Sequence, residues 1–210
     1  MTEHDKLTEE KIFESATEVF LDKGMDGARM QDIANHAGIN KALLHYYYRT
    51  KDRLFDMVFE KIAGLMFKKF APVFDETLTL DDKIRFFFRE HITFLQKNPR
   101  LPLFILNELN RNPARMRRLL ENIPVKTLWE KLEDQHPEEI KAMNLTREKI
   151  PQLMTTIASM SVFPFAARSV IGAIMEKAGY DFDRYIEERK DYAAEFVIAA
   201  LKNPKDNPTI

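Results

Sequence analysis

The sequence contains no cysteine, and this absence removes several kinds of chemistry. Disulfide bonds, thiolate nucleophiles and cysteine metal sites are all excluded. Only 6 of the 210 residues are glycine, and no glycine-rich phosphate loop, nucleophile elbow or zinc-protease motif is present. Glu133 and His136 have the spacing of one di-iron ligand pair, but that chemistry needs two copies and further glutamates. We therefore expect no enzyme activity, no metal and no cofactor.

Long apolar runs are also missing. Residues 1–10 are polar and acid-rich, without the apolar run of a secretory signal. The stretch between Lys149 and Arg168 carries no charge, but Pro151, Pro164 and several hydroxyl side chains interrupt it. We interpret this stretch as buried core or subunit interface and not as a membrane span. The expectation is a cytoplasmic protein with no membrane partner.

Strand alternation with hairpin turns is not sustained anywhere, whereas apolar residues recur at helical spacing through most of the chain. The predicted fold class is all-α with short connections. The main predicted helices cover residues 8–24, 30–38, 41–48, 51–70, 81–98, 103–110 and 181–201. The composition, 45% hydrophobic and 31% charged, fits one medium domain or a small head with a larger core.

Residues 30–48 predict two short helices joined by a tight turn. An apolar stripe at i, i+3, i+4 and i+7 begins at Met30, and Gly38 stands where a left-handed residue would stop the first helix. Asn40 is suited to cap the second helix. A connector of only a few residues is what a helix-turn-helix requires.

The second of these helices carries more aromatic surface than one core can bury. Successive residues step about 100° around a helix, so Tyr46 and its two tyrosine neighbours cannot all face inward. With Lys41, Leu43 and His45 they form an exposed face suited to a phosphate-lined major groove. The alternative is an ordinary helical hairpin whose aromatic side chains half-pack on neighbouring helices.

Charge is distributed unevenly, although the formal net charge is only -1. Residues 27–53 contain five cations (Arg29, Lys41, Arg49, Lys51 and Arg53) and two anions (Asp32 and Asp52), so this segment carries +3. A basic tip of this kind is typical of phosphate binding. Four glutamates precede it, and we expect them to repel phosphate and restrain non-specific binding. They are Glu9, Glu10, Glu14 and Glu18.

The segment from about Ile12 to Leu54 resembles the N-terminal DNA-binding domain of TetR/AcrR-family transcriptional repressors. The residues that carry the likeness are Ala16, Phe20, Gly24, Asp32-Ile33-Ala34, Ala37-Gly38-Ile39, Leu44, Tyr47, Lys51 and Leu54. The resemblance implies a three-helix, helix-turn-helix DNA-binding head over residues 1–52. Residues 53–210 would form a larger helical body that binds an effector and dimerises, and the helix after residue 51 would link the two.

The resemblance also assigns roles to individual residues. Lys41, Ala42, Leu43 and Gln31 would face base edges of the operator. The residues that would contact phosphates are His45, Tyr46, Tyr47 and Lys51. Arg29 departs from the family pattern, but its charge still allows it to contact phosphate.

Two features depart from the family pattern. Ala28 and Arg29 stand where the family usually has threonine or serine, which leaves the helix after Arg29 without an obvious side-chain cap. Leu43 replaces a frequent threonine and suggests apolar contact with a thymine methyl group.

The body contains large, pliable apolar side chains with a few polar ones among them. As a set they are compatible with an apolar or aromatic effector, although any single one is more often a core residue. The candidate effector residues are Phe87, His91, Phe104, Asn107, Trp129, Met154, Phe163 and Arg168. The family's last two long helices usually pair with a second subunit, which implies a homodimer here.

The function predicted from these features is a ligand-responsive repressor. It would bind a palindromic DNA operator as a homodimer and be released by a small-molecule effector. The alternative is a helical small-molecule-binding or enzymatic domain whose head no longer reads DNA, because the first helix is acidic and Ala28, Arg29 and Leu43 are unusual.

Overall fold

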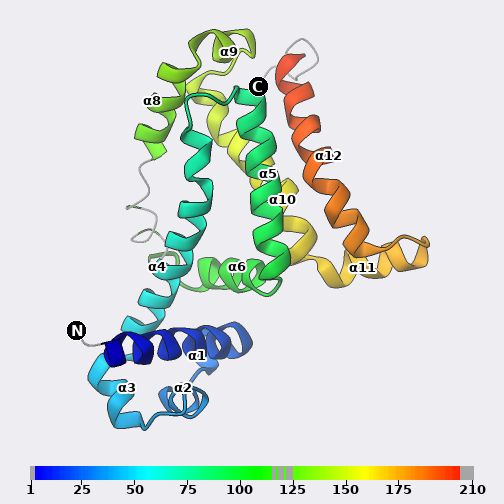
Figure 1. Ribbon diagram of the computed structural model, residues 1–210. Helices are drawn as coiled ribbons and strands as arrows, with labels where there is room; N and C mark the ends of the chain where they lie inside the picture. The colour runs from blue at the N-terminus through cyan, green and yellow to red at the C-terminus, as the bar shows by residue number, and fades with distance from the viewer. Residues whose placement is uncertain (1–2, 115–116, 118–120, 122–124, 204–210) are drawn as a thin grey trace. The chain divides into compact units, whose positions relative to one another are not determined.

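A computed structural model describes residues 3–114, 117, 121 and 125–203, and every regular element in these ranges is a helix (Figure 1). The all-α prediction is confirmed. The chain divides into two compact units. The first comprises Met1–Phe67 with Phe104–Leu120, and the second comprises Lys68–Leu103 with Glu121–Ile210. The sequence predicted a domain boundary after residue 52, at the end of the helix-turn-helix motif. The boundary between the two compact units lies instead after Phe67, within the helix Lys51–Phe70.

The first unit is built on a core of three aromatic rings. Its helices are α1 (Glu3–Gly27), α2 (Met30–His36), α3 (Lys41–Tyr47), most of α4 (Lys51–Phe70) and most of α6 (Leu101–Arg111). Phe55 of α4 packs edge-on against Phe20 of α1, with ring centroids 5.0 Å apart, and lies 5.7 Å from the ring of Phe104 in α6. All three rings are buried, so helices distant in sequence share one core.

Helix α1 contains a break at Gly24, where φ is +66° and ψ is 175°. A residue with a Cβ is strained at such a φ, which explains why glycine occupies the position. The prediction that the first helix ends at Gly24 matches this break, although one further turn follows to Gly27 and the helix begins earlier than expected, at Glu3.

The turn between α2 and α3 has the predicted chemistry. Gly38 adopts φ +66°, and the Asn40 side chain accepts a hydrogen bond of 2.7 Å from the Leu43 amide. Thr50 likewise caps α4 by accepting from the Arg53 amide at 3.2 Å. Helix α2 begins after Arg29 without a side-chain cap, as expected from the missing hydroxyl.

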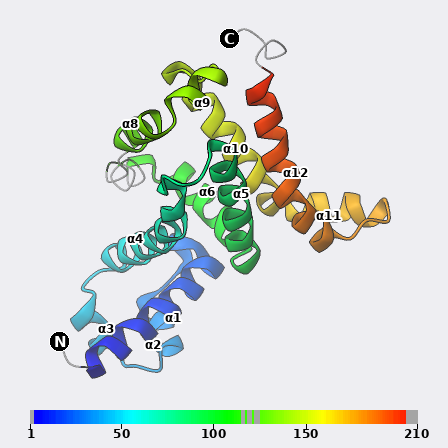
Figure 2. The same cartoon turned by 45° about the horizontal axis from the view of Figure 1, so that its top comes forward.

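Three long helices form the centre of the second unit. α5 (Leu80–Lys97) packs against both α12 (Phe182–Lys202) and α10 (Ile150–Ala166), and the two views of Figures 1 and 2 show them side by side. Phe88 and Ile92 of α5 and Ile186 of α12 are almost completely buried. The remaining elements are η1 (Ala71–Phe74), α8 (Val125–Gln135), α9 (Pro137–Ala142), η2 (Arg147–Lys149) and α11 (Arg168–Lys177).

Ion pairs follow the seam between α5 and α12. Arg85 donates to Glu195 at 2.6 Å and Arg89 to Asp191 at 2.8 Å, while Lys202 pairs with Asp81. Exposed pairs of this kind each contribute little to stability. The apolar residues between the two helices therefore hold the seam together.

A buried lysine fixes the entry to α5. Lys83 is 2% exposed, and its Nζ donates to the carbonyl oxygens of Val73 at 2.7 Å and Asp75 at 2.5 Å. Burial lowers the pKa of this ammonium group. The carbonyl contacts compensate the lost hydration of its charge and tie η1 to α5.

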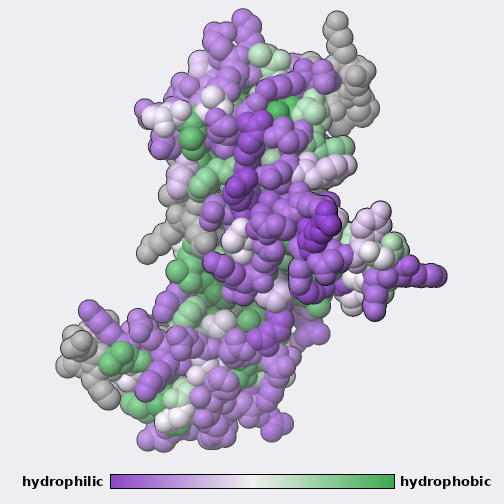
Figure 3. Space-filling model, turned by 45° about the vertical axis from the view of Figure 1, so that its right-hand side comes forward, coloured by the Kyte–Doolittle hydropathy of each residue, from purple (hydrophilic) through white to green (hydrophobic). Residues whose placement is uncertain are grey.

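Among the described residues, no single helix combines the length and the apolar composition of a membrane span. Arg147–Ala166 and Arg168–Lys177 meet both criteria only when they are taken together, and this pair is bent by 74°. On the face drawn in Figure 3, hydrophilic residues predominate and hydrophobic ones form small separate patches.

Replacing Phe55 by alanine should lower the free energy of unfolding by about 3 to 5 kcal/mol, because it empties the centre of the aromatic core of the first unit. Urea unfolding followed by circular dichroism measures this change. Leu7→Ala on α1 is the matched control, because Leu7 is 55% exposed, and it should cost under about 1 kcal/mol. Equal losses in the two variants would contradict the assigned core.

Candidate nucleic-acid interface

The predicted DNA-contacting residues all lie in the first unit, and most of them are exposed. Leu44, at the centre of α3, is fully buried and anchors that helix, whereas Tyr46 is 80% exposed. The expectation that part of the tyrosine cluster faces outward is confirmed. Leu43, Tyr47 and Lys51 are half-buried. The exposed members are Arg29, Gln31, Lys41, Ala42, His45 and Tyr46.

Helices α2 and α3 present this set together because they are short and packed against each other. Gln31 donates to Asn35 at 2.8 Å, which holds the amide along the exposed side of α2. His45 Nδ1 lies 3.3 Å from the carbonyl oxygen of Arg49. Lys41 is exposed in the first turn of α3, directly after the Asn40 cap.

An ion pair offsets one of the negative charges in this basic segment. Lys23 of α1 lies 2.7 Å from Asp32 of α2, and this contact lowers the pKa of the aspartate. Asp32 is one of only two anions between residues 27 and 53. Its pairing with a lysine from outside that segment leaves the positive charge of the tip less opposed.

Lys51 has a structural contact that the sequence did not reveal. Its Nζ donates to the carbonyl oxygens of Ala28 at 3.0 Å and Asp26 at 3.3 Å. The ammonium group therefore satisfies carbonyl groups in the turn between α1 and α2. The phosphate contact expected of Lys51 stays a prediction.

Tyr47 is also held by a neighbour. Its hydroxyl donates to Asp5 Oδ1 at 3.1 Å. Desolvation, followed by the hydrogen bond to Asp5, raises the pKa of the phenol above its usual value. The hydroxyl is therefore protonated at neutral pH and acts as a donor.

Helix α6 supplies a second set of contacts to the turn between α1 and α2. Glu108 is 3% exposed and accepts from the Met25 amide at 3.4 Å, while Arg111 lies 3.4 Å from the Asp26 carboxylate. The sequence did not predict these contacts, because no local pattern links residues 83 positions apart. The only signal in the sequence was an acidic residue, Glu108, within a largely apolar segment.

Residues 12–58 match the family model described as bacterial regulatory proteins, tetR family. Two curated relatives match part of the chain. The HTH-type transcriptional repressor SCO4008 of Streptomyces coelicolor is 44% identical over 56 residues, which are 27% of this chain and 29% of that protein. The biofilm operon icaADBC HTH-type negative transcriptional regulator IcaR of Staphylococcus epidermidis is 28% identical over 80 residues, 38% and 43% of the two chains.

This chain thus carries, at residues 12–58, a segment that matches the tetR family of bacterial regulatory proteins. It spans less than half the length of these two curated relatives. A solved structure of the transcriptional regulator FadR from Bacillus subtilis, in complex with stearoyl-CoA, extends the similarity of fold beyond the head. It has a TM-score of 0.62 and 17% identity, and the match covers 88% of this chain and 96% of that one.

The candidate effector residues fall in both compact units of the chain. Phe104 and Asn107 belong to the first unit, where Phe104 is part of the aromatic core and Asn107 is exposed. The other six belong to the second unit. Their role in effector binding stays a prediction.

Within the second unit these six residues have different surroundings. Phe87 lies beside His91 on α5, with ring centroids 5.2 Å apart, and Trp129 packs on a cluster around Leu80. Met154 and Phe163 of α10 are 52% and 61% exposed. Arg168 contacts Asp183 at 3.4 Å and lies over the ring of Phe182, so its charge is balanced within the fold.

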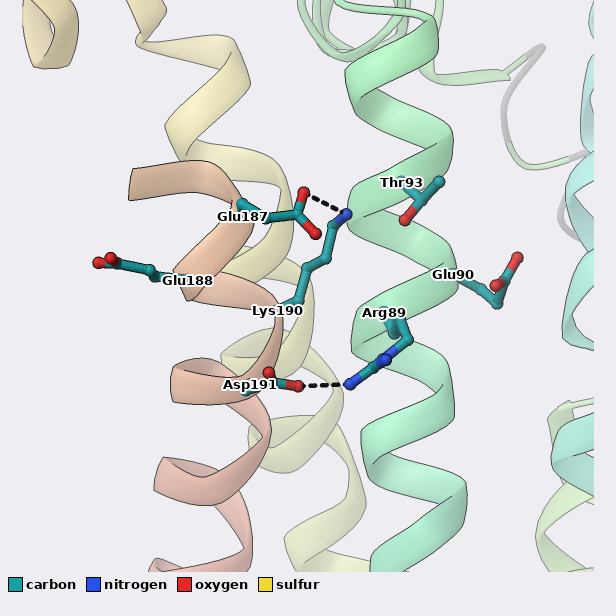
Figure 4. A pocket seen from close by; sticks show the side chains of 7 residues that line it. All are labelled: Arg89, Glu90, Thr93, Glu187, Glu188, Lys190 and Asp191. Carbon is teal, nitrogen blue, oxygen red and sulfur yellow. Dashed lines mark hydrogen bonds and ion pairs between the residues drawn. The ribbon is translucent and has the colours of Figure 1, made fainter. Parts of the chain in front are cut away.

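A surface hollow of the second unit is lined by a different set of residues. It lies between α5 and α12, and Figure 4 shows the Arg89–Asp191 and Lys190–Glu187 pairs at its walls. Every lining residue is polar or charged, which does not suit the apolar effector that was predicted. The lining residues are Arg89, Glu90, Thr93, Glu187, Glu188, Lys190 and Asp191.

Glu133 and His136, the pair with di-iron spacing, have separate partners. Glu133 binds Arg147 at 2.7 Å, and His136 Nδ1 lies 2.7 Å from Glu139. Among the residues that the structure describes, no group of three or more potential metal ligands is found.

Because His91 is buried, we expect the free energy of unfolding to decrease in acid. Burial lowers its pKa from 6.5 to about 4, so between these values the unfolded chain binds more protons than the folded one. The free energy of unfolding should fall as pH decreases through this window, by about 2 kcal/mol between pH 7 and pH 4.5 from this group. His91→Phe should remove that part of the pH dependence in urea unfolding. An unchanged pH dependence would contradict the assigned burial.

Proposed function

We propose that this chain is a DNA-binding transcriptional regulator of the TetR family that acts as a homodimer on a palindromic operator. The observation that carries the proposal is the exposed face of α2 and α3, flanked by the exposed cations Arg29, Arg49 and Arg53, within the matched tetR-family segment. α3 is the proposed recognition helix, with Lys41, Ala42 and Leu43 at base edges. Two copies of α3 would enter successive major grooves about 34 Å apart.

Exposed apolar side chains on the last helices support the second copy. Val170 and Ile174 of α11 are 61% and 62% exposed, and Tyr192 and Phe196 of α12 are 63% and 54% exposed. Each pair is separated by one helical turn and thus lies on one face. The α12 pair is stacked with ring centroids 6.3 Å apart. Apolar surface of this kind is typical of protein interfaces.

The proposed response is release from the operator when a small apolar or aromatic effector binds the body. Such release requires the effector to bind one arrangement of the dimer better than the DNA-bound arrangement. Stearoyl-CoA is a reasonable first probe, because it is the ligand in the solved B. subtilis FadR structure that shares this fold.

Selection of random duplex DNA by the purified protein tests the proposal. The expected result is enrichment of one palindrome, bound by two copies, with an affinity that falls steeply between 50 and 200 mM salt as phosphate contacts release counterions, by roughly a factor of 10³ or more. A folded protein that enriches no sequence, with and without stearoyl-CoA, would contradict the proposal. That result would favour a helical small-molecule-binding domain.

Lys41→Ala should weaken the selected site by about 1 to 3 kcal/mol and relax base preference at one position of each half-site, because it removes a base-edge contact. Competition titrations with single-base variants of the operator measure both effects. Lys141→Ala, an exposed position on α9 of the second unit, controls for the loss of one positive charge. A uniform loss across all sequences would contradict direct readout by Lys41.

A further inference from the structure

The hydroxyl of Tyr47 is hydrogen-bonded to side chains near the start of α1. It donates to Asp5 Oδ1 at 3.1 Å, across 42 residues of sequence, and also hydrogen-bonds the hydroxyl of Thr8 one turn further along α1. Thr8 is buried, whereas Asp5 and Tyr47 are half-buried. The phenol is therefore held by two side chains at the edge of the candidate DNA-binding surface.

A phenol has a single proton to donate. In this structure the acceptor is a carboxylate, which makes a stronger hydrogen bond than a neutral oxygen. A DNA phosphate can receive that proton only if Asp5 releases it. The same carboxylate also brings a negative charge close to any phosphate that approaches the phenol, and like charges repel.

We propose that Asp5 is a negative determinant of DNA affinity, which acts by holding the Tyr47 hydroxyl and by repelling the phosphate that this hydroxyl would otherwise contact. The proposal rests on the proposed DNA-binding function. Phosphate contacts carry no sequence information, so Asp5 lowers affinity for every duplex and leaves base preference unchanged. Asp5 is in this sense a positioning residue for Tyr47.

Two substitutions separate the charge of Asp5 from its hydrogen bond. Asp5→Asn keeps an acceptor for the Tyr47 hydroxyl but removes the charge, and it should tighten binding roughly threefold, the factor for one unit charge about 6 Å from a phosphate in water. Asp5→Ala removes both and should tighten binding roughly tenfold, because the freed hydroxyl gains a charge-assisted bond to phosphate. In a Tyr47→Phe background the gain from Asp5→Ala should shrink to roughly threefold.

Glu138→Gln is the matched control for the loss of one negative charge. Glu138 is exposed on α9 of the second unit, outside the unit that carries the candidate DNA-binding surface. Its replacement should change affinity by less than about twofold, because salt screens exposed charges that lie far apart. Fluorescence anisotropy with the selected duplex and with a mixed-sequence duplex gives the affinities, and thermal unfolding confirms that each variant is folded.

The outcomes separate this inference from the proposed function. Wild-type binding with unchanged or weaker binding by folded Asp5→Ala would overturn the role of Asp5 and leave the DNA-binding function intact. An equal gain from Glu138→Gln would show a general charge effect and would also overturn it. If neither the wild type nor any variant binds either duplex, the proposed function fails and this inference fails with it.

Discussion

The turn between α1 and α2 is the constraint on which the head depends. Gly24 leaves the helical path with a positive φ, and the residues that follow it are hydrogen-bonded by side chains of α4 and α6. Lys51 of α4 binds the carbonyl oxygens of Asp26 and Ala28, and Glu108 of α6 accepts from the Met25 amide. Because α2 starts at Met30 without a side-chain cap, these contacts and not the helix terminus fix its start. α3 is then set by its packing on α2 and by the Asn40 cap.

Helix α6 takes part in this constraint and has residues in both compact units. Its first residues belong to the second compact unit, whereas Phe104 onward belongs to the first, where Phe104 joins the aromatic core and Glu108 reaches the turn. α4 also continues from one unit into the other. α4 and α6 therefore each have residues in both compact units, and both contact the turn between α1 and α2.

Local patterns predicted most of the long helices to within about two residues at each end, but not the start of α1 and not the helices α8 to α11. Gly38, Asn40 and the exposure of Tyr46 follow from spacing and capping rules that involve neighbours in sequence, and the structure confirms each of them. The contacts of Lys51, Glu108 and Asp5 join residues 23 to 83 positions apart and leave no periodic trace. The effector residues were chosen by side-chain type, which does not distinguish the buried Phe104 from the exposed Phe163. Composition led to the prediction of an apolar effector, which stays a prediction, whereas the tertiary packing decides which side chains share a cavity.

Hydrogen exchange with and without a duplex at low salt tests the central claim most directly, because it locates the DNA-binding surface without any substitution. The account predicts slower exchange of the backbone amides in residues 29–51 on addition of DNA, with little change along α5 in the second unit. Protection confined to the second unit, or no protection of α2 and α3 under conditions where the protein binds the duplex, would contradict it.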